Sequence, residues 1–135
     1  MIVVDANIAL SWVLEAEGGA FDYAQTVARE GVAGRALIAP AVLRAECGYV
    51  LLKKGRAGKW GAVKIAEFAE VIEAFNVQLY ESDATLPEHV RFALRHNVSG
   101  FDAYYLALAM RAGAAIATQD KGLIAAAKAA GVSPF

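Results

Sequence analysis

Two carboxylates stand where short apolar segments of the chain end. Asp5 directly follows the run Ile2–Val4, and Asp120 comes two residues after a run at residues 115–118. Both runs have the length and composition of buried strands, and ligands of open α/β sheets gather at the carboxyl ends of strands. The two carboxylates could therefore share one sheet edge and hold a cation there. Each could equally cap the helix that follows, which is a common role for aspartate.

A third carboxylate, Glu46, lies in a predicted helix at residues 41–54. At about 100° per residue, Glu46 falls on the edge of the apolar arc of that helix. A carboxylate held against a packed face is costly unless something compensates its charge. The compensation is either an ion pair with nearby Arg44 or Lys53, or a bound metal ion.

Asp102 is the fourth carboxylate, in the first turn of a predicted helix at residues 101–112. The helix dipole favours a negative charge at that position, and this alone could explain the residue. Asp102 also shares a helical face with Leu106 and Ala109, which have the character of core residues. We therefore expect its side chain to point inward, toward the sheet edge.

Convergence of these four carboxylates would have a chemical consequence. Negative charges held close together repel one another strongly unless cations bind between them. A ligand set made only of oxygen favours Mg²⁺ or Mn²⁺ over zinc. Such ions can activate a water molecule and neutralise charge on a phosphodiester. If the four residues meet, the pattern predicts nuclease chemistry.

The predicted elements that would position these residues alternate between strand and helix. Strands are predicted at residues 2–4, 36–39, 77–80 and 115–118, with 132–135 as a candidate edge strand. Helices are predicted at 8–14, from a break at 17–19 to about 32, and at 41–54, 62–75, 86–96, 101–112 and 123–130, with a basic, glycine-rich turn at 55–61. The alternation is typical of an α/β fold with a central parallel sheet of four or five short strands flanked by helices.

Length and composition set the remaining limits. The chain of 135 residues, 58% hydrophobic, fits a single domain over residues 1–135 with a core of its own. Its net charge of −1 gives no overall basic field, although a nuclease can keep its basic residues local. Cys47 is the only cysteine, which excludes an intrachain disulfide and a cysteine zinc site. Without a signal-like N-terminus or a long apolar run, we expect a cytoplasmic protein.

Four segments of the sequence, in their order and spacing, resemble PIN-domain proteins and especially the VapC-type toxins. They read VVDAN at residues 3–7, RAE at 44–46, SGFDAYYLALA at 99–109 and ATQDKGL at 117–123. Each is of modest specificity alone, and the resemblance extends over residues 3–132. It implies a metal-dependent endoribonuclease that uses Mg²⁺ or Mn²⁺ to cut single-stranded RNA, commonly in tRNA or rRNA loops. It assigns the acidic, metal-binding pocket to Asp5, Glu46, Asp102 and Asp120, and supporting roles to Asn7 and Thr118.

The resemblance also implies partners. A ribonuclease of this kind would damage its own cell, so a cognate antitoxin protein is expected, and the apolar composition is compatible with a homodimer. An arginine of the antitoxin could pair with two pocket carboxylates. The candidate apolar anchors for the antitoxin are Trp12, Phe21 and Tyr23, unless these aromatic side chains belong to the core.

Two other classes of protein compete with this interpretation. A phosphoryl-accepting receiver domain needs an acidic pair after the first strand and an aspartate closing the third. Here Ala6 follows Asp5, and the third strand runs into Glu81 and Ser82. A non-catalytic PIN-like binding module would be indicated by a missing acid, and all four acids are present.

Other reactive or basic residues have simpler explanations or two open ones. Lys53, Lys54, Arg56 and Lys59, beside Trp60, either bind RNA phosphates with an aromatic ring for a base, or form a solvated helix end. Cys47 lies in a helical apolar arc and is expected in the core. His89 and His96 have no serine or cysteine nucleophile at a recognisable spacing.

Overall fold

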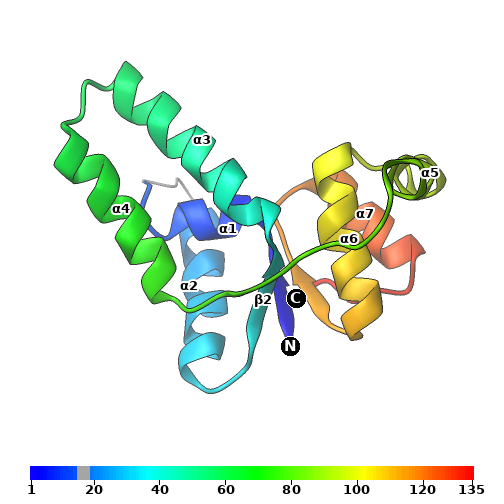
Figure 1. Ribbon diagram of the computed structural model, residues 1–135. Helices are drawn as coiled ribbons and strands as arrows, with labels where there is room; N and C mark the ends of the chain where they lie inside the picture. The colour runs from blue at the N-terminus through cyan, green and yellow to red at the C-terminus, as the bar shows by residue number, and fades with distance from the viewer. Residues whose placement is uncertain (15–18) are drawn as a thin grey trace.

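The computed structural model describes residues 1–14 and 19–135, and these form an α/β fold (Figure 1). The break predicted at residues 17–19 lies mostly outside this described part. In chain order the elements are β1 (Ile2–Val4), α1 (Ala6–Ser11), α2 (Gly19–Val32), β2 (Leu37–Pro40), α3 (Val42–Ala57), α4 (Ala62–Ala74), β3 (Gln78–Tyr80), α5 (Leu86–His96), α6 (Gly100–Ala112), β4 (Ala115–Ala117) and α7 (Lys121–Ala129).

The four strands of the described residues form one parallel sheet in the order β3-β2-β1-β4. Val3 of the central strand β1 pairs with Ile38 of β2 on one side and with Ile116 of β4 on the other. Every residue of β1 is fully buried, as expected for a parallel strand covered on both faces. Because all strands are parallel, the residues that follow β1, β2 and β4 lie at one edge of the sheet.

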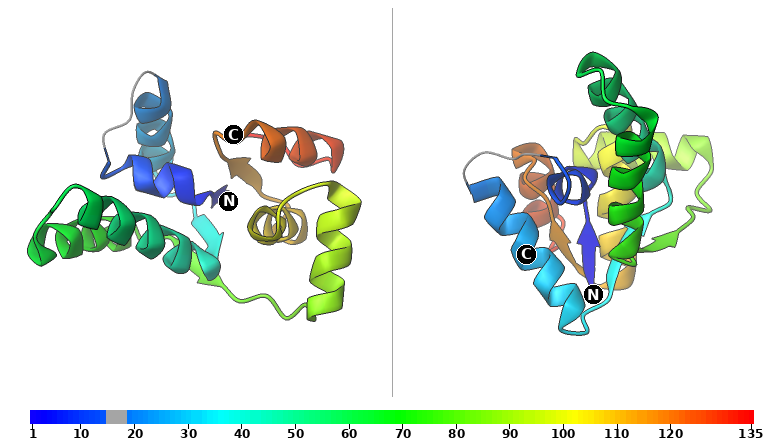
Figure 2. Two further views of the ribbon diagram at one scale, coloured as in Figure 1. Left: turned by 90° about the horizontal axis from the view of Figure 1, so that it is seen from above. Right: turned by 90° about the vertical axis from the view of Figure 1, so that its left-hand side faces the viewer.

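The helices cover the sheet from two sides. Figure 2 shows α1–α4 on one side of the sheet and α5–α7 on the other. The chain moves outward from β1 to β3 and then returns to β4, so right-handed crossovers place the two sets of helices on opposite faces. The core between these layers includes the fully buried side chains of Ile8, Tyr105, Leu106 and Leu123. The predicted fold class is therefore confirmed, with four strands in the described residues.

The predicted turn at residues 55–61 is wrong in its first half. Helix α3 continues through Ala57, so Gly55 is helical. A Cβ atom at Gly55 would lie 2.5 Å from Cδ1 of Ile65 on α4, which shows why this helical position is glycine. Local propensity disfavours glycine within a helix, but close packing of α4 against α3 overrides it.

The candidate fifth strand at residues 132–135 is reduced to one bridge. Pro134 pairs with Ile116 as an isolated parallel bridge, and no ladder develops among the described residues. The bridge consists of two hydrogen bonds: the N–H of Ile116 donates to the carbonyl of Ser133 at 3.0 Å, and the N–H of Phe135 donates to the carbonyl of Ile116 at 2.9 Å. Among the described residues, no helix combines the length and apolar character needed to cross a membrane.

Candidate active site

Asp5 is held at the carboxyl end of β1 by two hydrogen bonds. Its Oδ1 accepts the backbone N–H of Ala6 at 2.7 Å, and its Oδ2 accepts the hydroxyl of Thr118 at 2.6 Å. The residue is 5% exposed, although it is charged and the strand before it is apolar. Asp5 is the N-cap of α1, as one interpretation predicted. Capping alone does not explain the second bond, which comes from the end of the neighbouring strand β4.

Thr118 connects Asp5 to Asp120. While its hydroxyl donates to Asp5, its Oγ1 accepts the backbone N–H of Asp120 at 3.0 Å. Asp120 in turn accepts the N–H of Leu123 at 2.8 Å through Oδ1 and caps α7, with its side chain in an exposed position. One buried hydroxyl therefore links the acids that follow β1 and β4, the two adjacent strands. The hydroxyl of Thr118 thus bonds one carboxylate and the backbone beside another, and its supporting role in a site stays a prediction.

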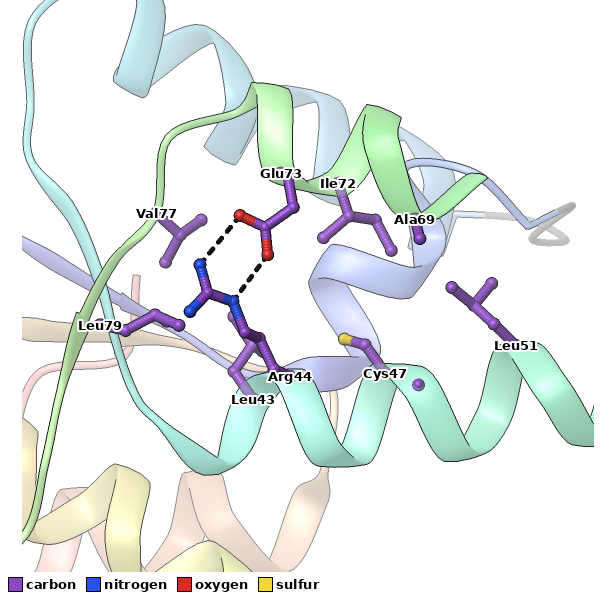
Figure 3. Close-up of a pocket in the computed structure, with 10 residues that line it drawn as sticks. Leu43, Arg44, Cys47, Leu51, Ala69, Ile72, Glu73, Val77 and Leu79 are labelled. Carbon is purple, nitrogen blue, oxygen red and sulfur yellow. Dashed lines mark hydrogen bonds and ion pairs between the residues drawn. The ribbon is translucent and has the colours of Figure 1, made fainter. Parts of the chain in front are cut away.

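Glu46 is half-buried on α3 and accepts a hydrogen bond of 2.8 Å from the hydroxyl of Tyr105. The alternative ion pair with Arg44 is wrong, because Arg44 makes a bidentate pair with Glu73 of α4 at 2.7 and 3.1 Å. Figure 3 shows these two side chains facing each other between α3 and α4. The ion pairs found among the described residues do not include Glu46 or Lys53. Among the described residues, the carboxylate of Glu46 is thus met by a phenol hydroxyl and not by a basic side chain.

Asp102 lies in the first turn of α6, with its own N–H donated to the hydroxyl of the N-cap residue Ser99 at 3.1 Å. The side chain is half-buried, and its surroundings raise its pKa. Burial is the largest cause, followed by the charge of Asp120. Asp102 is thus partly withdrawn from water and lies within the influence of the Asp120 charge.

Three of the four carboxylates, Asp5, Glu46 and Asp102, have a raised pKa to which other acids of the group contribute, which indicates that the group gathers at one edge of the sheet. Burial raises the pKa of Asp5 to about 6 against the opposing effect of its two hydrogen bonds, and the charges of Asp102 and Asp120 raise it further. The pKa of Glu46 is raised by burial, lowered by the bond from Tyr105, and raised by Asp5 and Asp102. Mutual repulsion of this kind is what a bound cation would relieve.

The side chains of this group are of the chemical type that binds hard divalent cations. All four side chains offer carboxylate oxygens, which Mg²⁺ and Mn²⁺ prefer. Asn7, two residues after Asp5, contributes a buried Oδ1 that has no hydrogen-bond partner among the described residues. The described histidine, cysteine and acidic side chains nevertheless form no group of three that encloses a single ion.

Tyr105 is the site residue that sequence reasoning missed. It is fully buried, and its hydroxyl reaches Glu46 across 59 positions of sequence. Tyr105 comes three residues after Asp102 on α6, and residues at this spacing are neighbours on a helix surface. This spacing was the sequence feature that could have linked Tyr105 to the site. The hydroxyl of a buried tyrosine usually has a hydrogen-bond partner, and a carboxylate of the site could have been expected in that role.

Trp12, Tyr23 and Cys47 make their contacts away from the four carboxylates. Trp12, a candidate antitoxin anchor, is in the core, with its Nε1 donating to the carbonyl of Ala24 at 2.9 Å and its ring stacked on Phe75. Tyr23 is half-buried and donates its hydroxyl to the carbonyl of Phe135. Cys47 is buried as predicted, next to an apolar cavity of about 110 Å³ between α3 and α4 (Figure 3). That cavity lies on the side of α3 that faces α4.

A parallel α/β sheet with carboxylates gathered at its carboxyl edge defines a class of small domains with an acidic site, and this chain is a member of that class. More specifically, it belongs to the PIN domain family, whose model matches residues 2–129. PIN domains are typically nucleases. Among solved structures, PAE2754 from Pyrobaculum aerophilum has a similar fold, with a TM-score of 0.64, 22% sequence identity, and coverage of 93% of this chain and 83% of that one. No curated protein sequence matches this chain.

Proposed function

We propose that this protein is an endoribonuclease that depends on Mg²⁺ or Mn²⁺. The observation that carries the proposal is the gathering of Asp5, Glu46, Asp102 and Asp120 at one sheet edge. There the charges of Asp102 and Asp120 raise the pKa of Asp5, those of Asp5 and Asp102 raise the pKa of Glu46, and that of Asp120 raises the pKa of Asp102. A fold gains no stability from such repulsion, so the arrangement is explained by a ligand of positive charge. Membership of the PIN domain family supports the view that a cation bound there serves nuclease chemistry.

The pocket residues have separable tasks in this proposal. Asp5, Asp102 and Asp120 would hold the metal with Glu46, and the bound ion would supply neutralisation of charge on the phosphodiester. A pocket carboxylate accepts the proton of the attacking water, whose oxygen forms the new bond to phosphorus while the bond to the 3′ oxygen breaks. The products carry 5′-phosphate and 3′-hydroxyl ends. Thr118 and Asn7 orient the carboxylates.

A cleavage assay on single-stranded RNA tests this function. We expect cutting with Mg²⁺ or Mn²⁺ and none in excess chelator. Asp5→Asn and Asp102→Asn should abolish cutting and leave the protein folded by circular dichroism. The matched control is Asp22→Asn, the same chemical change at an exposed position on α2, which should cut at the wild-type rate. Cutting that persists in chelator, or in both site variants, would contradict the proposal.

We further propose that the protein is the toxin of a toxin–antitoxin pair and works in the cytoplasm, with structured tRNA or rRNA loops as substrates. The support is the resemblance of its four motifs to VapC-type toxins. An arginine of the antitoxin would pair with two pocket carboxylates, in competition with metal. Among the aromatic anchors first considered, Phe21 remains available, with 44% of its surface exposed.

Co-expression tests the toxin role separately from the nuclease role. The neighbouring small reading frame should encode a protein that co-purifies with this chain and relieves growth arrest. Asp5→Asn should abolish the arrest and retain co-purification if Phe21 and the remaining surface supply the contacts. If the chain is soluble and non-toxic and the protein from the neighbouring reading frame does not co-purify with it, the toxin role is contradicted, while the proposal of RNA cleavage is unaffected.

We propose a homodimer as the working state, and light scattering on the purified protein measures its mass in solution.

A further inference from the structure

The α3–α4 hairpin concentrates positive charge. The twenty residues from Cys47 to Ala66 contain no acidic side chain and five basic ones, namely Lys53, Lys54, Arg56, Lys59 and Lys64. Because the whole chain carries −1 and this segment +5, the remaining residues carry −6. A local basic region on an otherwise acidic protein is the electrostatic footprint expected for a polyanionic ligand. Figure 1 shows that α3 begins beside the end of β2 and extends away from the sheet toward the hairpin tip.

One face of α3 connects the acidic pocket to this basic region. Tyr49, Lys53 and Arg56 follow Glu46 by three, seven and ten residues. At about 100° per residue they fall with Glu46 within an arc of about 80°, and Lys53 lies about 10 Å from Glu46 along the helix axis. We call Tyr49, Lys53 and Arg56 the α3 strip. The buried residues of α3, among them Leu43, Cys47 and Leu51, point in another direction, toward α1 and α4.

The side chains of the α3 strip are open to a ligand. Tyr49 keeps 66% of its surface exposed, and the Nζ atom of Lys53 lies 5.8 Å from the centre of its ring. The ion pairs found among the described residues include neither Lys53 nor Arg56. Arg44, on the side of the helix that faces α4, is by contrast paired with Glu73. The strip therefore offers an exposed aromatic ring and two cations that no described acidic side chain neutralises.

Trp60, the aromatic residue that the sequence placed beside the basic stretch, is engaged within the hairpin. Its ring meets Phe68 edge-on at 5.4 Å, and the Nζ atom of Lys64 lies 4.6 Å from its centre. Trp60 also closes on Gly58, where a Cβ atom would lie 2.7 Å from its Nε1. The packing of the hairpin thus occupies Trp60, whereas Tyr49, on the same face of α3 as Glu46, is an exposed aromatic ring.

We propose that the α3 strip binds the single-stranded RNA that the acidic pocket cuts, with Tyr49 stacking on a base and Lys53 and Arg56 contacting phosphates. This inference rests on the proposed ribonuclease function and adds where the substrate lies. Stacking on aromatic rings combined with basic contacts to the backbone is the general mode of binding unpaired RNA. Because the strip begins one helical turn from Glu46, RNA bound along it leads directly into the pocket.

Binding of RNA without cleavage tests the strip. The probe is a fluorescein-labelled, mixed-sequence single-stranded RNA of about 12 nucleotides, within the usual site size of such proteins. The protein carries Asp102→Asn throughout so that the probe stays intact. We expect Tyr49→Ala to weaken binding about 5- to 100-fold, the effect of losing one stacked base. Tyr49→Phe should restore it, because phenylalanine keeps the ring.

Salt dependence separates phosphate contacts from general charge. We expect Lys53→Gln to reduce the slope of log affinity against log salt concentration by about 0.7, the value for one phosphate of a single strand. The matched control is Lys64→Gln, the same change on the same hairpin, but at a lysine held over Trp60. It should leave the slope and the affinity close to those of the parent. Equal effects of both lysine variants would show only a diffuse field and would overturn the proposed strip.

Cleavage kinetics distinguish this proposal from the function on which it rests. In the protein with its four acids intact, strip variants should raise KM and leave kcat near the wild-type value. If the wild type cuts RNA and the strip variants match it in KM and salt slope, the strip proposal fails alone. If the wild type neither binds nor cuts any RNA, the proposed function fails with it. A change of oligomeric state in Tyr49→Ala, with RNA binding unaltered, would instead identify the strip as a contact between copies and overturn the proposal.

Discussion

The hydroxyl of Thr118 donates a 2.6 Å hydrogen bond to Oδ2 of Asp5, across 113 positions of sequence. The bond joins the ends of β1 and β4, which are adjacent and parallel in the sheet. It also lowers the pKa of Asp5 against the larger effect of burial. The relationship between these two residues therefore bears on both the geometry and the charge of the proposed catalytic pocket.

Replacement of Thr118 by valine should reduce RNA cleavage about 10- to 100-fold, the usual cost of losing a residue that orients metal ligands. Valine keeps the shape but neither donates to Asp5 nor accepts from the N–H of Asp120. Thr118→Ser retains the hydroxyl and should stay within a few-fold of wild type. Initial rates at saturating metal, with folding checked by circular dichroism, measure the effect. Equal rates in the valine and serine variants would show that the hydroxyl has no role in the reaction.

Asp5 should make the metal-free protein less stable as pH rises. Its pKa of about 6 exceeds the ordinary value of 3.8, so the folded chain holds the proton more tightly than the unfolded chain. Its contribution to stability is fully present below about pH 4 and is lost as the pH rises through about 6, amounting to about 3 kcal/mol. The pKa values of Glu46 and Asp102 are also raised and act with the same sign.

Urea denaturation of Asp5→Asn in excess chelator checks this prediction. Relative to wild type, the variant should gain about 2–3 kcal/mol of unfolding free energy between about pH 4 and pH 7. Asp22→Asn, the exposed control, should run parallel to wild type across the range. A difference between Asp5→Asn and wild type that does not change with pH would mean that the Asp5 carboxyl titrates normally in the folded protein.

Tyr105→Phe should impair the reaction by changing the protonation of Glu46. The Tyr105 hydroxyl lowers the pKa of that carboxyl, so its removal raises the pKa further. We expect the acid limb of the pH–rate profile to move to higher pH, with activity about 10-fold lower at neutral pH. Because Glu46 remains partly exposed to water, the stability cost should be about 1 kcal/mol. An unshifted profile would show that the bond serves packing alone.

Cys47 should be dispensable for the chemistry. Burial raises the pKa of its thiol to about 12, with further contributions from Glu46 and Asp5, so the thiol is unreactive at neutral pH. Cys47→Ala should cost about 1 kcal/mol of stability by enlarging the apolar cavity beside it, and leave the rate of RNA cleavage unchanged. A thiol reagent should react with Cys47 only when the protein unfolds. Loss of activity with an intact fold would revive a thiol mechanism.

Local pattern in the sequence was enough to predict the sheet, and it led to the expectation that the acids lie at its carboxyl edge. The apolar run before Asp5 has the length and composition of a buried strand, and the parallel sheet confirms that prediction. The direction of parallel strands then places Asp5 and Asp120 at one edge. Helical periodicity placed Glu46 at the border of a packed face and turned Asp102 inward. These features depend on residues only a few positions apart, and such short-range information is contained in the sequence itself.

Tertiary packing decided which groups meet. Arg44 had an acid two residues away, yet it pairs with Glu73 of another helix, and Glu46 binds Tyr105 instead. Trp12 entered the core because a neighbouring helix supplied a carbonyl for its indole N–H. Gly55 became helical because Ile65 of α4 needs the space that a Cβ atom would fill. Each of these choices depends on distances between separate helices, and those distances are set only when the helices pack together.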